Sequence, residues 1–90
     1  AIHAAAKVVV DKSPFANAFG AMVGHGIGIE TVELPLLTAG NETELRAGMV
    51  LCVEPGLFVP NWGGALIEHE VIVQASGPPE VISKTAARLW

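Results

Sequence analysis

The chain has 90 residues and carries five Lys and Arg side chains against nine Asp and Glu, which gives a formal net charge of −4. Charged residues make up 16% of the chain and hydrophobic residues 51%, whereas a soluble domain usually has about 25% charged residues. A net acidic chain with few, scattered cations excludes a basic surface for nucleic acid. No apolar run approaches the ~20 residues that cross a bilayer, so a membrane partner is excluded too. We expect one globular domain.

Cysteine content and the first residues bear on the cellular compartment. Cys52 is the single cysteine and cannot form an internal disulfide, which fits a reducing environment. The first residues, Ala1-Ile2-His3, do not show the basic region and apolar core of a secretory signal. These features predict a cytoplasmic location.

The first half of the chain predicts a helix and then a strand. Apolar residues recur at helical spacing over Ile2–Lys12, and Ser13-Pro14 ends this helix because the residue before a proline is pushed out of the α region. Four glycines fall within the nine residues Gly20–Gly28. This density disfavours a helix and predicts a strand that another part of the chain approaches closely.

The rest of the chain predicts further strands joined by loops. Extended chain and loop are expected over Glu30–Gly40, and a short capped turn over Asn41–Glu44. Met49–Glu54 and Ala65–Val73 are predicted strands that are apolar on both faces, and Glu80–Ser83 is a last short strand. One helix cannot cover both faces of such a sheet. The pattern therefore predicts an α+β chain that lacks part of its cover.

Three polar side chains stand within otherwise apolar segments, namely His25, Glu54 and Glu68. A carboxylate removed from water costs several kcal/mol unless it is paired or bound to a metal. None of the five cations lies close in sequence to Glu54 or Glu68. One imidazole and two carboxylates form an oxygen-rich ligand set that suits Mn, Fe, Co or Zn. The pattern therefore indicates a candidate metal site.

Each of these residues also has a structural interpretation. His25 could be a hydrogen-bonded loop or core residue, and Glu54 could be a solvated strand end. Glu68 and Glu70 could form the polar face of an edge strand, although Leu66 on the same predicted face argues against this. From the residues alone, both interpretations stay open.

Other residues of the types that carry chemistry are expected to be structural. Cys52 fits a small core residue. His69 points in the opposite direction to Glu68 along the same predicted strand. His3 is expected on the surface of the first helix.

Short motifs follow one another in a fixed order: Gly24-His25-Gly26-Ile27-Gly28, Leu45-Arg46-Ala47-Gly48-Met49, Glu54-Pro55-Gly56 and Ile67-Glu68. Together they resemble the creatinase/aminopeptidase or "pita-bread" family, which includes methionine aminopeptidases, Xaa-Pro aminopeptidases, prolidases and creatinase. The resemblance extends over roughly residues 1–84. Each motif is weak by itself, whereas the set in register is specific.

The resemblance implies a fold, a site and a reaction. It implies that residues 1–90 are the C-terminal part of one pita-bread catalytic domain, an antiparallel-rich curved sheet with covering helices. It further implies that His25, Glu54 and Glu68 bind two divalent ions (Mn, Co, Fe or Zn), with Glu68 bridging them. A metal-bridging hydroxide would be the nucleophile. Glu54 is then the candidate catalytic residue, because a ligand carboxylate is placed to move protons.

Several positions depart from the family pattern. Two aspartate ligands are expected before the first helix, but the one aspartate here, Asp11, follows it. The chain by itself should therefore be inactive. Val32 stands where peptidases usually carry a second histidine, and Leu66 where proline-specific members carry arginine. Glu70 adds a carboxylate where smaller polar residues are common.

The expected function is that of a metal-dependent hydrolase, by default an aminopeptidase or Xaa-Pro dipeptidase that cleaves the N-terminal bond of small peptides. Its expected partners are the substrate, the remaining N-terminal part of its own domain and, as in many family members, a second copy in a homodimer. Two alternatives remain. One is a creatinase-like hydrolase or lyase that acts on a non-peptide substrate, and the other is a degenerate binding module without catalysis.

Overall fold

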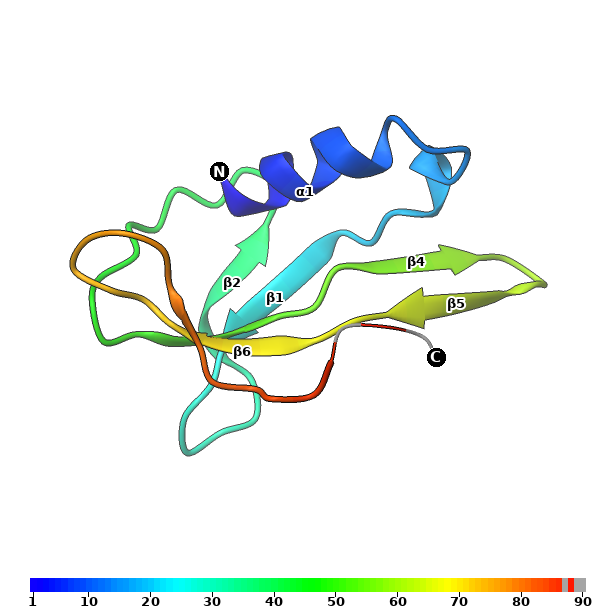
Figure 1. Cartoon of the computed structure of the whole chain (residues 1–90). Helices are drawn as coiled ribbons and strands as arrows, with labels where there is room; N and C mark the ends of the chain where they lie inside the picture. Colours follow the sequence, from blue (N-terminus) through cyan, green and yellow to red (C-terminus); the bar gives the residue numbers. More distant parts are fainter. Residues whose placement is uncertain (87, 89–90) are drawn as a thin grey trace.

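The computed structural model describes residues 1–86 and 88, and it contains one α-helix, one 3-10 helix and seven strands (Figure 1). The α+β expectation is confirmed, because the elements are mostly antiparallel strands with a single α-helix against them. No helix in this part of the chain is long and apolar enough to span a bilayer. The elements are α1 (Ile2–Val10), η1 (Ala16–Ala18), β1 (Met22–Gly26), β2 (Glu33–Thr38), β3 (Val50–Val53), β4 (Gly56–Val59), β5 (Gly63–Leu66), β6 (His69–Ile72) and β7 (Glu80–Val81).

Five of the strands form one antiparallel sheet in the order β2-β1-β3-β6-β7, and β4 pairs with β5 in a separate two-stranded ribbon. Helix α1 lies along β1 and β2 on one face of the larger sheet (Figure 1). The core forms on that face from Val23, Leu37, Leu51 and Val71, which come from four different strands. Burying each such side chain contributes roughly 1.5–3 kcal/mol.

Helix α1 is shorter than predicted and buries an unexpected side chain. It ends at Val10, and Asp11 forms an ion pair with Lys7 at 2.6 Å instead of continuing the helix. The expectation that His3 lies on the helix surface is wrong, because His3 is buried. Its spacing of three residues from Ala6 puts it on the side of α1 that faces the sheet. There its Nε2 lies 3.3 Å from the Gly20 carbonyl oxygen.

The segment expected as extended chain and loop contains strand β2, which pairs with β1 through the Cα partners His25 and Leu36. The capped turn after it is present but is not helical. The backbone N–H of Thr43 donates to Asn41 Oδ1 at 2.8 Å, and the Asn41 amide donates to the Leu36 carbonyl at 2.7 Å. Asn41 thus ties the turn to β2.

The prediction of one continuous strand over Ala65–Val73 is wrong. The segment divides at Ile67 and Glu68 into β5 and β6, which belong to different sheets. Pro55, between β3 and β4, stands opposite this break in the neighbouring stretch of the same chain, and proline has no N–H to donate to the hydrogen-bond ladder. The ladder is therefore interrupted there, so that β3 and β4 on one side and β5 and β6 on the other cross from sheet to ribbon together.

The last strand, expected over Glu80–Ser83, is limited to β7 and pairs with β6 through Val71 and Val81. Ser83 instead anchors the end of β6. Its hydroxyl accepts from the Glu70 backbone N–H at 3.2 Å and lies 2.7 Å from His69 Nδ1. This contact supports the structural role expected for His69.

Candidate metal centre

One row of directly opposed residues crosses the sheet face that lies away from α1. His25 on β1 is the Cα partner of Cys52 on β3, and Cys52 is the partner of Glu70 on β6. Directly opposed residues in antiparallel strands project to the same face. An imidazole, a thiol and a carboxylate therefore lie side by side, whereas Leu51 and Val71 on the same strands project into the core.

Two further carboxylates share this face. Glu54 follows Cys52 by two residues and Glu68 precedes Glu70 by two, and alternate residues of extended chain point to the same side. The pairs Val53–His69 and Gly56–Leu66 lie on either side of the interrupted ladder and have the same register. Stepping one residue from Val53 and His69 places Glu54 opposite Glu68.

The side chain of His25 is fixed with one ring nitrogen engaged. His25 is 5% exposed, and its Nδ1 lies 2.8 Å from the Gly26 carbonyl oxygen. A carbonyl can only accept, so Nδ1 carries a hydrogen and Nε2 is the ring nitrogen that faces Glu54. That nitrogen lies 3.5 Å from Glu54 Oε1, which is longer than an ordinary hydrogen bond of about 2.7–3.2 Å.

The glycines on either side of His25 are required by the packing of the neighbouring strands. Gly24 has φ +154°, and a Cβ there would overlap the carbonyl oxygen of Cys52 on β3. A Cβ on Gly26 would stand 2.5 Å from the Leu34 carbonyl oxygen on the other side. The glycine-dense motif thus lets β2 and β3 approach β1 closely around the imidazole.

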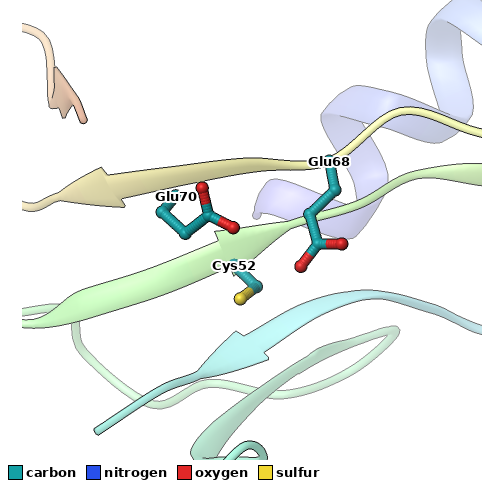
Figure 2. Close-up of side chains that lie close together, drawn as sticks. All are labelled: Cys52, Glu68 and Glu70. Atoms are coloured by element: carbon teal, nitrogen blue, oxygen red, sulfur yellow. The ribbon is translucent and has the colours of Figure 1, made fainter. Parts of the chain in front are cut away.

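Figure 2 shows Glu68 and Glu70 extending from neighbouring positions over Cys52. The Cys52 Sγ and one carboxylate oxygen from each glutamate lie within 4.8 Å of one another. Burial raises the pKa of the Cys52 thiol, and the hydrogen bond to Glu68 and the negative charges of the three nearby glutamates act in the same direction, so that together they bring the pKa to about 11. At neutral pH this group is a protonated thiol.

The structure brings the predicted ligands together in two groups. His25 and Glu54 are in contact at 3.5 Å, whereas the carboxylate of Glu68 lies beside Cys52 and Glu70. The Glu54 side chain is 19% exposed and Glu68 is exposed. All of them occupy one face, and Cys52 joins the groups because it is opposite His25 and close to Glu68.

The sequence predicts Cys52 as a small core residue, and it leaves Glu70 either on the polar face of an edge strand or as a departure from the family pattern. Both residues belong to the polar cluster on this face. The alternation of side chains in Met49–Glu54 already placed Cys52 on the same side as Glu54. Only the pairing of β3 with β1 and β6, which a single sequence does not specify, adds His25 and Glu70 to that row.

The donor set fits a divalent cation. Three carboxylates and one imidazole nitrogen share the face, and in residues 1–86 and 88 no Lys or Arg forms an ion pair with any of them. Like charges directly opposed across two strands are destabilising. A cation held among hard oxygen and nitrogen donors would relieve this repulsion.

The departures from the family pattern occupy distinct places. Asp11 is at the end of α1, bound to Lys7 by the exposed ion pair, and contributes nothing to the carboxylate face. Val32 is exposed in the turn between β1 and β2, and Leu66 is exposed at the end of β5.

Comparison with known sequences identifies relatives over most of this chain. Residues 1–75 match metallopeptidase family M24. The chain is 39% identical over 72 residues to a putative dipeptidase, YkvY, of Bacillus subtilis, which covers 80% of this chain and 20% of that protein. It is 33% identical over 84 residues to an Xaa-Pro dipeptidase of Pyrococcus horikoshii, with 93% and 24% covered.

Solved structures resemble the fold closely. The dipeptidase PepE from Mycobacterium ulcerans superposes with a TM-score of 0.89 at 38% identity over 97% of this chain and 23% of its own. The X-Pro aminopeptidase from Thermotoga maritima gives 0.88 at 28% identity over 96% and 24%. These likenesses confirm the expected pita-bread fold. The chain spans about a quarter of the length of these relatives.

Proposed function

This chain belongs to metallopeptidase family M24, and on that premise we propose that the protein containing it is a metal-dependent hydrolase that cleaves the N-terminal bond of small peptides. The proposal rests on the sheet face that carries the carboxylates, where His25 Nε2 and Glu54 Oε1 stand 3.5 Å apart and Glu54 lies opposite Glu68. Relatives named Xaa-Pro dipeptidase support a dipeptide as substrate.

In this proposal His25, Glu54 and Glu68 would hold two divalent ions, which are Mn, Co, Fe or Zn. Bound metal would supply a low-pKa water and polarise the scissile carbonyl. Two more carboxylates from elsewhere in the protein complete the ligand set, because this chain offers only Asp11 and that residue is engaged on α1. Residues 1–90 are then the C-terminal part of the catalytic domain and are inactive alone.

The chain's own residues contribute orientation and proton transfer. The Gly26 carbonyl holds the His25 ring so that Nε2 faces the carboxylates. Glu54 is half-buried next to that nitrogen, and its carboxylate can take a proton from the attacking water and pass it to the leaving amine.

We further propose that this protein is cytoplasmic and that it forms a homodimer.

A second candidate keeps the metal and changes the substrate. Val32 stands where the family's peptidases usually carry a second histidine, and Leu66 where its proline-specific members usually carry an arginine, so two polar side chains that could contact a peptide are replaced by apolar ones. These substitutions favour a non-peptide hydrolase or lyase of the creatinase type. They also suit a binding module that has lost catalysis, although such a module has no need to keep His25, Glu54 and Glu68 on one face.

Titration calorimetry with Mn²⁺ on the full-length protein tests the metal site. We expect about two bound ions, and we expect His25→Ala to abolish one high-affinity site. His69→Ala is the matched control, because His69 points to the other face and contacts Ser83. Unchanged binding in the His25 variant would remove His25 from the ligand set.

Hydrolysis assays then separate the candidate functions. The full-length protein is incubated with dipeptides that have or lack a proline in second position, and with creatine. Release of the N-terminal residue supports the peptidase, whereas turnover of creatine alone supports the second candidate. Metal binding without any turnover would favour the binding module.

A further inference from the structure

Glu68 stands at the break between the sheet and the ribbon, where its backbone is not held by a strand ladder. It follows β5 and precedes β6, and Pro55 opposite the break has no N–H to donate. Glu54 is anchored differently, because its backbone N–H donates to the Val23 carbonyl oxygen at 2.8 Å. Within residues 1–86 and 88, no backbone hydrogen bond of this kind joins Glu68 to a neighbouring segment. The orientation of the Glu68 carboxylate therefore depends on contacts of its own side chain.

One such contact comes from Cys52 on β3. Cys52 is 1% exposed, so packing fixes its side chain, and strand pairing places it between His25 and Glu70. Its thiol forms a hydrogen bond with Glu68, and Sγ and one oxygen each of Glu68 and Glu70 lie within 4.8 Å of one another (Figure 2). An ionised carboxylate only accepts hydrogen bonds, so the S–H is the donor. A side chain fixed in the core of a strand thus holds a side chain that extends from the break.

The surroundings of Glu68 leave this role to the thiol. In the part of the chain that the structure describes, no Lys or Arg pairs with Glu68, and no other side chain donates a hydrogen bond to it. The carboxylate of Glu70 close by carries the same charge and repels that of Glu68. A hydrogen bond to an ionised acceptor is stronger than one between neutral groups. The thiol is therefore placed to hold the Glu68 carboxylate against this repulsion.

We propose that Cys52 is a positioning residue for Glu68: its S–H donates to one carboxylate oxygen and fixes the orientation in which Glu68 binds metal. The inference rests on the proposed function, in which Glu68 is a ligand. Side chains that hydrogen-bond metal ligands orient them, and the loss of such a side chain typically costs about 10–100-fold in metal affinity. A cysteine that served only to fill the core would be replaceable by any apolar side chain of similar volume. The two roles therefore predict different responses to substitution.

A pair of isosteric substitutions in the full-length protein separates the two roles. Threonine and valine have nearly the same shape and both suit a strand, but only threonine has a hydroxyl that can donate to Glu68. In titration calorimetry, Cys52→Val should weaken Mn²⁺ binding by about tenfold or more, whereas Cys52→Thr should bind nearly as tightly as the unchanged protein. Equal affinities in the two variants would overturn the proposal, because a core residue has no use for the hydroxyl. If Cys52→Thr does not fold, Cys52→Ser and Cys52→Ala give the same comparison of a donor with a non-donor.

Infrared spectroscopy of the metal-free full-length protein tests the hydrogen bond itself. The S–H stretch of Cys52 is identified as the band that Cys52→Val removes. We expect this band to shift to higher frequency in Glu68→Gln, because an amide oxygen accepts a weaker hydrogen bond than a carboxylate does. Glu70→Gln is the matched control, because it removes an equal charge from the cluster but not the acceptor, so it should shift the band less. A band that stays in place in Glu68→Gln would overturn the proposal.

The two measurements distinguish failure of the positioning role from failure of the proposed function. If the unchanged protein binds no Mn²⁺ although the S–H band responds to Glu68→Gln, the proposed function is wrong and the positioning role is overturned with it. If Mn²⁺ binds, and Cys52→Val binds it as tightly as Cys52→Thr does, only the role of Cys52 is wrong.

Discussion

The imidazole of His25 is fixed by the next residue of its own strand and is enclosed by the two neighbouring strands. The Gly26 carbonyl engages Nδ1, and β2 and β3 close in where Gly24 and Gly26 carry no Cβ. The other ring nitrogen, Nε2, faces the carboxylate of Glu54. An imidazole nitrogen and a carboxylate oxygen are thus fixed 3.5 Å apart, and both are donor types that bind divalent cations.

Cys52 gives a pH-dependent prediction at the residue scale. Its thiol has a pKa of about 11 in the folded chain against 9.0 as the ordinary value, so between these values the unfolded chain binds fewer protons than the folded one. Stability is therefore fully present below pH 9 and falls as pH rises toward 11, by roughly 2–3 kcal/mol. Urea unfolding of the metal-free full-length protein at pH 8 and 11 measures the loss.

Because lysines also titrate in this range, Cys52→Ala is the reference. The variant should lose the part of the pH dependence that belongs to the thiol, and its free energy of unfolding should fall less between pH 8 and 11. Identical slopes in the two proteins would mean that folding does not raise the pKa of the thiol.

At the scale of elements, the sequence predicts a strand correctly where an apolar run ends at a local turn signal, and it fails where strand pairing sets the boundary. Met49–Glu54 was recognised because both faces are apolar and Pro55-Gly56 follows. The division of Ala65–Val73 was missed, since nothing within that segment interrupts it. The interruption comes from Pro55, which is distant in sequence and adjacent in the ladder. The local pattern of residues within a segment does not predict which distant residues pair with it.

The same limit explains which site residues were found. His25, Glu54 and Glu68 stood out because each is polar within an apolar run, which is a local property. Glu70 and Cys52 belong to the cluster only because β3 lies between β1 and β6. His3 was misplaced for a related reason, since the side of α1 that faces the sheet is set by packing.

Strand β1 yields a prediction about glycine. Gly24→Ala should destabilise the full-length protein by roughly 3 kcal/mol or more, because its Cβ would overlap the Cys52 carbonyl and the whole of β3 would have to move. Gly40→Ala is the matched control. Gly40 also has positive φ, +75°, but no atom lies within 4 Å of its Cβ position, so it should lose only about 1–2 kcal/mol. Urea unfolding compares the two, and equal losses would contradict the close approach of β3.

At the scale of the whole molecule, the two faces of the sheet differ in polarity and in what would stabilise them. One face is apolar and is half covered by α1, and the other gathers three carboxylates with no described cation against them. The low charge and high apolar content of the chain follow from the first face. The first face requires apolar cover from the rest of the protein. The second face requires positive charge against its carboxylates, which the proposed metal ions would supply.

Metal removal tests the second requirement. A ligand that binds only the folded state at a thousandfold excess over its Kd stabilises it by about 4 kcal/mol, so stripping the full-length protein with a chelator should lower its melting temperature and Mn²⁺ should restore it. Glu68→Gln should abolish most of this Mn²⁺-dependent rise, because it removes a charged ligand opposite Glu54. Glu70→Gln is the matched control: it removes an equal charge from the same cluster but no proposed ligand. If both variants lost the rise equally, net charge alone would account for metal binding, and the assignment of Glu68 as a ligand would be wrong.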